Sequence, residues 1–271
     1  MDYLDGGGED ECTLRRNRTA FDEHEFHPKL LRNVSHVDTS TNVLGRAIPV
    51  PIVLAPVGAP RLFHHEGELA VARAARDAKI PYAISTLSST SLEAITGETD
   101  KDLWLGLYVW GDRGIARDLI GRAKACGYRV LVVTADVTVR SKRERELRAG
   151  LHLPSPSLRL RTLAEAGLHP SWWWHFLTSS PIEFANLPRD DQNGPVQDVS
   201  GLFDGTVTWD DVAWIKDVWR GPLVVKGITS VEGARRAADA GANGIIVSNH
   251  GGRQLDHLPA TIDVHNTLLS L

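Results

Sequence analysis

Short apolar runs alternate with amphipathic segments along the chain, and this alternation constrains the fold more than any other feature of the sequence. Each run spans at most seven residues and is rich in valine, isoleucine and leucine, as a buried strand requires. In the segments between them, apolar residues recur at the spacing of a helix. The pattern predicts an α/β fold with a parallel sheet and right-handed crossovers. The predicted strands cover residues 49–55, 82–85, 103–109, 130–134, 222–226 and 244–247.

Capping residues and glycines set the limits of several predicted helices. Thr208 followed by Asp211 begins one helix, and Thr229 with Glu232 forms a capping box at the start of another. Gly127 ends a helix that covers residues 112–126. The other predicted helices cover residues 9–22, 66–78, 91–95 and 259–271.

Polar or small residues gather where the predicted strands end. In a parallel α/β fold the carboxyl ends of the strands meet at one edge, and ligands bind there. This shared placement favours an active site of the TIM-barrel type, and a Rossmann fold is disfavoured because no Gly-x-Gly-x-x-Gly follows the first strand. The residues at or near strand ends are Gly58, Ser85, Tyr108, Thr134, Asp136, Lys226, Ser248 and His250.

The last predicted strand, 244–247, should be buried on both faces, and it runs directly into polar residues and glycines. A base, His250, and a permanent cation, Arg253, follow three residues apart, which suits proton abstraction from an anionic substrate. The alternative is a plain loop in which the histidine has no chemical role. Lys226 has two interpretations as well, because a lysine that closes an apolar strand either reaches solvent or faces a negative ligand.

A long connection at about 137–207 interrupts the regular pattern. It holds a charged cluster at 140–148, prolines at 154, 156, 170, 181 and 188, and three consecutive tryptophans at 172–174. A connection of this length inside a compact domain is usually a lid, a binding loop or an insertion. We therefore predict one domain over 1–271 with a lid-like insertion, in which the tryptophans serve core or interface packing rather than a cofactor platform.

Composition narrows the class of protein further. The net charge of −4 argues against nucleic acid as a partner. Cys12 and Cys126 supply neither a disulfide framework nor a metal cluster, so no metal site is predicted and a reducing cytoplasm is the simplest location. The sequence contains no apolar run of about 18 residues that would predict a transmembrane helix, and its acidic start is unlike a signal or transit peptide.

The stretch Ser-Asn-His-Gly-Gly-Arg-Gln-Leu-Asp at 248–256 resembles the signature of the FMN-dependent 2-hydroxy-acid oxidase and dehydrogenase family, which includes glycolate oxidase, L-lactate dehydrogenase and mandelate dehydrogenase. Further motifs of that family follow in the expected order over nearly the whole chain. They are Asp2-Tyr3, Leu54-Ala55-Pro56, Leu107-Tyr108-Val109, Thr134-Ala135-Asp136, Arg143 and Val225-Lys226-Gly227.

The resemblance implies oxidation of an L-2-hydroxy acid, with L-lactate as the model substrate, to the 2-oxo acid, with hydride passing to N5 of FMN. It implies that His250 is the base and that Asp136 orients it. It also implies that Arg143 and Arg253 bind the substrate carboxylate, and that Tyr3 and Tyr108 bind substrate oxygens. The residues that it places against FMN are Ala55, Pro56, Val57, Gly58, Ser85, Thr134, Lys226 and Ser248.

The chain departs from the family pattern at several points. Gly106 stands where a glutamine usually contacts the flavin, Val57 replaces a common threonine, and Leu87 replaces a tryptophan. The largest expected departure is truncation, because only about six strand and helix units are predicted. The last two strands of a (β/α)8 barrel, with the FMN phosphate site, are not found. The resemblance therefore predicts an incomplete TIM-type barrel, with a homo-tetramer as the possible assembly.

Two other functions remain open at this stage. The first is a truncated, non-catalytic relative that acts as a binding or assembly partner. The second is another TIM-barrel enzyme, such as an aldolase, in which Lys226 forms a Schiff base. The preferred hydroxy acid and the electron acceptor (oxygen, a quinone or a cytochrome) are not encoded in these motifs.

Overall fold

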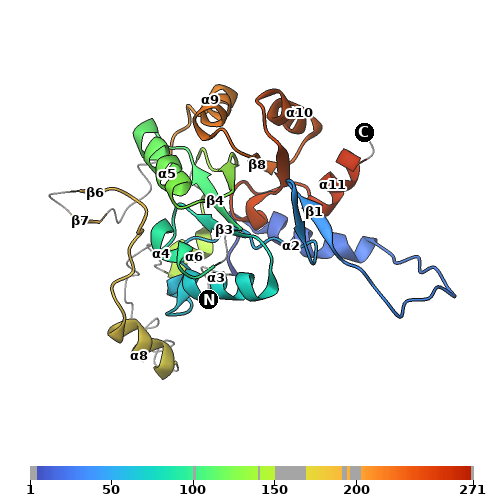
Figure 1. Cartoon of the computed structure of the whole chain (residues 1–271), viewed down its shortest axis with the longest axis horizontal. Coiled ribbons are helices and arrows are strands. Elements are labelled where there is room, and N and C mark those ends of the chain that lie inside the picture. Colours follow the sequence, from blue (N-terminus) through green and yellow to red (C-terminus); the bar gives the residue numbers. More distant parts are fainter. Residues whose placement is uncertain are drawn as a thin grey trace.

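The computed structural model describes residues 5–99, 102–139, 141–149, 169–190, 194–195 and 203–269. Its centre is a parallel sheet of five strands in the order β3-β4-β5-β8-β9 (Figure 1). The parallel α/β architecture predicted from the sequence is confirmed. The strands are β3 (Tyr82–Ser85), β4 (Leu103–Tyr108), β5 (Val130–Thr134), β8 (Leu223–Ile228) and β9 (Gly244–Val247).

A helix follows each of these strands along the chain. Helices α5, α9 and α10 lie side by side along the outside of the sheet (Figure 1). The N-terminal part of the chain adds a helix, two 3-10 turns and a two-stranded antiparallel hairpin. The helices of the sheet region are α3 (Gly67–Ala78), α4 (Leu92–Thr96), α5 (Arg113–Ala125), α9 (Trp209–Trp219), α10 (Val231–Asp239) and α11 (Thr261–Leu269). The N-terminal elements are α2 (Cys12–Thr19), η1 (Ala20–Glu23), β1 (Thr41–Val43), β2 (Arg46–Ile48) and η2 (Pro60–Leu62).

Successive residues of the central strands face opposite sides of the sheet, as the twofold period of a strand requires. Leu105 and Leu107 of β4 join the main core, which also contains Leu119 of α5. Trp104 joins a second buried cluster on the other side, together with Val132. The sheet is therefore buried on both faces, and its polar groups are left at the strand ends.

The predicted strand at 49–55 is wrong. Only Leu54 pairs with the sheet, through a single parallel bridge to Tyr82. Pro49 and Pro51 lack the backbone N–H that a ladder needs, and Ile52 is 51% exposed. The central sheet of the described residues consequently has five strands rather than the six that we predicted.

Three details at the other end of the sheet also differ from prediction. All residues of β9 are half-buried rather than buried on both faces, because β9 lies at the end of the strand order. Strand β8 extends two residues past Lys226, through Gly227 with a φ of +108° and a register shift against β9. The N-cap of α10 is Ser230, whose side chain accepts a hydrogen bond from the Gly233 N–H, rather than Thr229.

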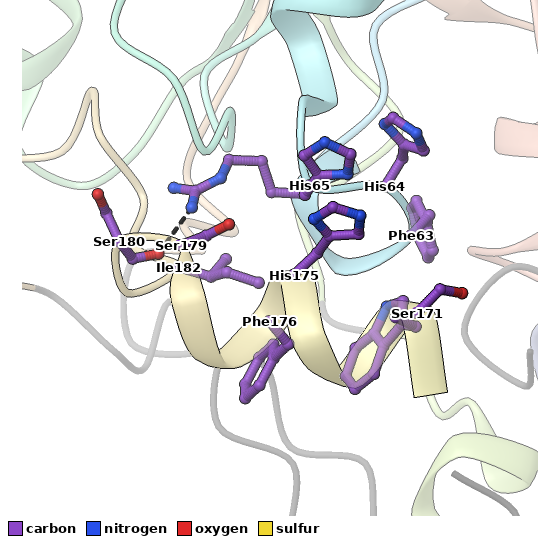
Figure 2. Close-up of a pocket in the computed structure, with 11 residues that line it drawn as sticks. Phe63, His64, His65, Ser171, His175, Phe176, Ser179, Ser180 and Ile182 are labelled. Atoms are coloured by element: carbon purple, nitrogen blue, oxygen red, sulfur yellow. Dashed lines mark hydrogen bonds between the residues drawn. The ribbon is translucent and has the colours of Figure 1, made fainter. Parts of the chain in front are cut away.

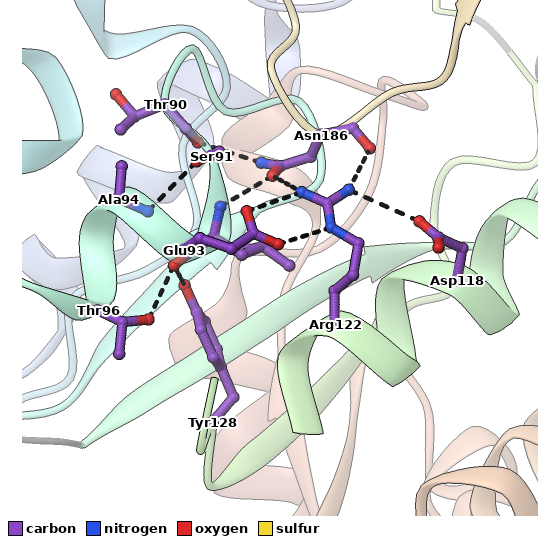
Figure 3. A network of polar contacts seen from close by, with 10 residues as sticks. Thr90, Ser91, Glu93, Ala94, Thr96, Asp118, Arg122, Tyr128 and Asn186 are labelled. Atoms are coloured by element: carbon purple, nitrogen blue, oxygen red, sulfur yellow. Dashed lines mark hydrogen bonds and ion pairs between the residues drawn. The ribbon is translucent and has the colours of Figure 1, made fainter. Parts of the chain in front are cut away.

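Part of the connection at 137–207 packs against the sheet helices. Figure 3 shows how Arg122 of α5 joins Glu93 of α4 to Asn186 of the connection. The Arg122 hydrogen bonds lower the pKa of Glu93 to about 2. Asn186 Oδ1 also accepts the Leu92 N–H at 3.0 Å. The region around Asn186 is thus part of the folded body, and the proposed lid role of the connection stays a prediction.

The tryptophan segment forms helix α8 (Pro170–Thr178), which lies to one side of the sheet (Figure 1). Trp172 donates its Nε1–H to the Leu62 carbonyl at 3.1 Å and stacks on Phe176. Trp174 is 68% exposed and Leu177 is 74% exposed. Packing therefore accounts for Trp172, whereas α8 presents an apolar surface to solvent. None of the described helices is both long and apolar enough to cross a membrane.

Candidate active site

The register of the sheet brings three predicted site residues together. Tyr108 of β4 pairs with Thr134 of β5, and Thr134 pairs with Lys226 of β8. They form a row at the C-terminal ends of three neighbouring strands. Ser85 of β3 pairs with Gly106, two residues before Tyr108 on β4. The register thus places these residues at one edge of the sheet, and their roles stay predictions.

His250 lies in the 3-10 turn η4 (His250–Gly252), between the carboxylate of Asp136 and the amino group of Lys226. Its Nδ1 is 2.9 Å from Asp136 Oδ1 and 3.3 Å from Lys226 Nζ. The lysine is also 3.6 Å from Asp136 Oδ2. Gly227 permits this approach, because a Cβ at that position would lie 2.7 Å from the Asp136 Cβ. Asp136, Lys226 and His250 thus form one charged group.

The tautomer of His250 follows from its contacts. Ionised Asp136 only accepts, so the hydrogen bond to it requires a proton on His250 Nδ1. That proton excludes a hydrogen bond from Lys226 to the same nitrogen, which leaves the lysine as a nearby charge. The proton-accepting atom of neutral His250 is then Nε2, as in a histidine that a carboxylate orients for base catalysis.

Burial and neighbouring charges shift the pKa of each member of this group. Burial lowers the pKa of His250, and the positive charges of Lys226 and Arg143 lower it further, while Asp136 opposes them. Burial also lowers the pKa of Lys226, against the opposing charge of Asp136. Burial alone would raise the pKa of Asp136, but its interaction with His250 and the positive charge of Lys226 bring it below its usual value. The site holds a neutral histidine that is ready to accept a proton.

The two predicted substrate arginines lie close together, and a carboxylate bridges them. Arg143 donates from Nε to the Arg253 carbonyl at 3.1 Å. Glu146 Oε1 is 3.3 Å from Arg143 NH1 and 3.1 Å from Arg253 NH2. Glu146, in helix α6 (Glu144–Ala149), was not predicted as a site residue. Its position three residues after Arg143 was the available sequence signal, since such residues share a helix face.

The N-terminal segment holds the histidine loop in place. Gly8 N–H donates to the Gly252 carbonyl at 2.8 Å, and a Cβ on Gly252 would lie 2.5 Å from the Leu14 nitrogen. Asp256 accepts the N–H groups of Cys12 and Thr13 at 3.0 and 2.6 Å. Burial would raise the pKa of Asp256, but these backbone hydrogen bonds hold it well below its usual range. The sequence reasoning missed Asp256 as a cap for α2, because the two segments are far apart in the chain.

Of the predicted flavin residues, Pro56, Ser85, Thr134 and Lys226 lie at this edge of the sheet. Ala55, Pro56, Val57 and Gly58 form the loop after Leu54, and a Cβ on Gly106 would lie 2.9 Å from the Pro56 Cβ. Two hydroxyls stabilise their own loops. Ser85 Oγ accepts the Leu87 N–H at 3.1 Å, and Ser248 Oγ accepts the His250 N–H at 3.0 Å. Tyr3 lies outside the described residues.

The donor set at this edge fits a flavin. The Lys226 side chain is only 10% exposed, so its cation would face a flavin N1 and O2 edge with little competition from water. Among the described residues, Asp136 Oδ2 is buried without a hydrogen-bond partner, although Lys226 is near. A polar ring system with both donors and acceptors could satisfy a buried cation and a buried oxygen that lacks a hydrogen bond.

A separate cavity of about 250 Å³ lies between α8 and the segment before α3 (Figure 2). It is lined by Arg61, Trp172 and three histidines, among which His65 and His175 stack with ring centroids 3.8 Å apart. Burial and the two neighbouring histidines lower the pKa of His65. None of the strand-end residues lines this cavity, so it is distinct from the candidate active site.

Among the described residues, one cluster combines side chains of the kinds that bind metal ions. The ligand atoms of Cys12, Asp256 and His257 all lie within 4.8 Å. Both oxygens of Asp256 already accept backbone N–H groups of α2. Its capping role accounts for the burial of this carboxylate, and the predicted absence of a metal stays a prediction.

The sequence matches the family model for FMN-dependent dehydrogenase over residues 1–269. It is 45% identical over 261 residues to a putative L-lactate dehydrogenase of Mycobacterium tuberculosis, which covers 96% of this chain and 62% of that protein. It is 40% identical over 260 residues to the L-lactate dehydrogenase of Ectopseudomonas mendocina, covering 94% of this chain and 68% of that protein. The chain thus spans about two thirds of the length of these relatives.

Solved structures give the same picture for the fold. A crystal structure of the monotopic membrane protein (S)-mandelate dehydrogenase superposes with a TM-score of 0.92 at 36% identity, covering 99% of this chain and 72% of that one. A mandelate oxidase variant with (S)-mandelic acid superposes with a TM-score of 0.80 at 38% identity, covering 99% and 68%. The predicted TIM-barrel family fold is confirmed, as is its partial extent relative to these proteins.

Proposed function

Because the chain belongs to the family of FMN-dependent 2-hydroxy-acid dehydrogenases and oxidases, we propose that it catalyses oxidation of an L-2-hydroxy acid to the 2-oxo acid. The observation that carries the proposal is the contact of His250 with Asp136 and Lys226, beside two arginines. A base, an anchor for an anion and a buried cation are the parts that this reaction needs.

His250 Nε2 takes the proton of the substrate 2-hydroxyl as the substrate is oxidised. Asp136 keeps the proton on Nδ1 and stabilises the imidazolium that forms. Burial and the neighbouring cations keep the pKa of His250 low, so the base is neutral before the reaction. Asp136 then offsets part of the cost of charging it.

Arg143 and Arg253 bind the substrate carboxylate, because planar guanidinium groups match carboxylate geometry. Tyr108, stacked parallel to Trp110 with centroids 6.3 Å apart, would hydrogen-bond a substrate oxygen, as would Tyr3. These contacts orient C2 of the substrate toward the strand ends. The relatives act, by their names, on either a small acid (L-lactate) or an aromatic one (mandelate). We propose an L-lactate-like substrate, because the chain is more similar to the L-lactate dehydrogenases.

Ala55 to Gly58, Ser85, Thr134, Lys226 and Ser248 would hold FMN at the strand ends. FMN, when bound, supplies the two-electron acceptor for the reaction. Lys226 would supply a buried positive charge to that acceptor, and the backbone of the loop at 55–58 and the hydroxyls would supply hydrogen bonds.

Two alternative functions make different chemical demands. A non-catalytic binding protein has no need for the buried contact of Asp136, His250 and Lys226, which is costly to assemble without a reaction to serve. A Schiff-base enzyme needs an uncharged Lys226 that reaches a carbonyl substrate. Trapping with borohydride and pyruvate tests that alternative, and we expect no covalent adduct on Lys226.

The main test is the visible absorption spectrum of the purified chain after addition of FMN and desalting, followed by anaerobic L-lactate. We expect the protein to stay yellow and to bleach with L-lactate. A version extended to the length of the relatives serves as the reference. If the chain and the extended version both retain FMN, and neither is bleached by L-lactate or L-mandelate, the proposed oxidation is wrong. A binding role then takes its place.

For the cellular location we propose the cytoplasmic side of a membrane surface. The support is the exposure of Trp174 and Leu177 on α8 and the likeness to a monotopic mandelate dehydrogenase. Sedimentation with anionic vesicles tests this, with W174S/L177S as the variant that should stay in the supernatant. The homo-tetramer stays a prediction, to be checked by light scattering.

A further inference from the structure

Glu146 is a carboxylate of the chain itself that pairs with both arginines assigned to the substrate. One oxygen, Oε1, accepts hydrogen bonds from Arg143 NH1 at 3.3 Å and from Arg253 NH2 at 3.1 Å. Its side chain is only 13% exposed, and the arginine side chains are 24% and 19% exposed. This pairing is shielded from solvent, unlike the surface pair that Glu144 makes with Arg148 on the same helix.

We propose that Glu146 is the resident counter-ion of the arginine pair, and that its charge restricts the site to substrates with a single carboxylate. The inference rests on the proposed function, because it assigns the two arginines to substrate binding. Glu146 acts through these arginines and does not take part in the chemistry. Its role is to set affinity and charge selectivity.

The charges of the site support this assignment. Lys226, Arg143 and Arg253 contribute three positive charges, while Asp136 and Glu146 contribute two negative ones, and His250 is neutral. The set therefore carries one net positive charge, which one carboxylate neutralises. A dicarboxylate would leave one net negative charge among largely buried groups, which is unfavourable in a medium of low dielectric constant.

Glu146 offsets the repulsion between the two arginines, but it is not what holds them in place. Two guanidinium groups repel each other, and a shared carboxylate removes that repulsion. Further contacts fix both side chains, since Arg253 donates to the Gly6 carbonyl at 2.7 Å and Arg143 donates to the Arg253 carbonyl at 3.1 Å. Loss of the Glu146 charge alone should therefore leave the arginines in place while raising their attraction for anions.

The experiment compares Glu146→Gln with the wild-type protein by calorimetric titration of the FMN-loaded chain. Pyruvate serves as the monoanion and oxalate as the dianion, so no turnover is needed. The substitution keeps an acceptor oxygen for both arginines and removes only the charge. The matched control is Glu144→Gln, which removes the same charge from an exposed pair on the same helix.

We expect the Kd of pyruvate to fall about tenfold in Glu146→Gln, and the Kd of oxalate to fall about a hundredfold, because Coulomb energy scales with ligand charge. Glu144→Gln should change both by less than about twofold, since an exposed pair is screened. The ratio of the two effects is the signature of charge selectivity, which a merely structural role would not produce.

Three outcomes overturn the inference. One is a Kd that rises for both anions in Glu146→Gln, which would make Glu146 a structural clamp. The second is an equal change for pyruvate and oxalate, and the third is an equal response in Glu144→Gln. If Glu146→Gln does not fold, Glu146→Ala is titrated with the same two anions and the same criteria. If the anions bind as expected but L-lactate does not bleach FMN, the proposed function fails while the charge selectivity stands.

Discussion

Replacing Asp136 by asparagine should slow the oxidation of the hydroxy acid far more than it weakens substrate binding. Asparagine keeps the size of the side chain and can still contact His250, but it carries no charge. The imidazolium that forms on His250 as it takes the substrate proton then loses its counter-ion. The substitution therefore raises the barrier of the chemical step and leaves the arginines that bind the carboxylate unchanged.

The structure sets the size of this effect. The distance of 2.9 Å between His250 Nδ1 and Asp136 Oδ1 is that of a direct ion pair once the histidine is charged. An ion pair with charge centres about 4 Å apart is worth about 4 kcal/mol at an effective dielectric constant of about 20. Both side chains are less than a fifth exposed, at 18% and 14%, so screening by solvent is small. The rate of the chemical step should fall about 10³-fold, since about 1.4 kcal/mol corresponds to tenfold.

Stopped-flow reduction of bound FMN by L-lactate under anaerobic conditions measures this step directly. Asp204→Asn is the matched control, because Asp204 is also 14% exposed and pairs with Arg113, a residue that is not assigned to the site. It should reduce FMN at the wild-type rate. A rate for Asp136→Asn within about threefold of wild type, with normal FMN content and melting temperature, would refute the role of Asp136.

Three further outcomes follow from particular contacts. Lys226→Met removes a cation that lowers the pKa of His250, so this pKa should rise. The acid limb of the pH profile of kcat/KM should then move to higher pH, and an unchanged limb would contradict the electrostatic account. Asp256→Asn should lower the free energy of unfolding by about 2–3 kcal/mol in urea melts through loss of charged hydrogen bonds to α2. Gly106→Ala should cost about 1–3 kcal/mol in the free energy of unfolding by overpacking against the Pro56 side chain, and Pro56→Gly in the same chain, which removes the closest atom, should restore part of it.

Periodicity and capping were enough to predict most of the fold. The strands at 82–85 and 130–134 were predicted with their observed bounds, because each is an unbroken apolar run between clear helix signals. The strand at 49–55 failed since the apolar run hides two prolines, each without an N–H for the ladder. The burial of β9 was overestimated because the sequence pattern does not reveal which strand lies at the end of the sheet order.

The residues of the candidate site likewise include some that the sequence predicts and some that it does not. Residues at strand ends were predicted because chain order and parallel topology place them at one edge. Glu146 and Asp256 were missed, because each has a partner that is distant in the chain: Glu146 contacts Arg253 as well as its neighbour Arg143. Asp256 accepts from residues more than 240 positions away, a pairing with no local sequence signal. The sequence therefore identified the residues that we propose for the chemistry, but not Glu146 and Asp256, which contact two of them or hold their loop.

The backbone of His250 shows why such holding groups are needed. His250 has a φ of +56°, in the left-handed region that costs a residue with a side chain on the order of 1 kcal/mol. Two contacts within the loop stabilise this turn, since Ser248 Oγ accepts the His250 N–H and Asn249 Oδ1 accepts the Gly252 N–H at 3.2 Å. Asn249 is itself fixed by Asn17 of α2 at 2.9 and 2.7 Å. The conformation that directs the base toward the strand ends therefore depends on α2, so substitutions in that helix should alter the position of His250 without touching the substrate.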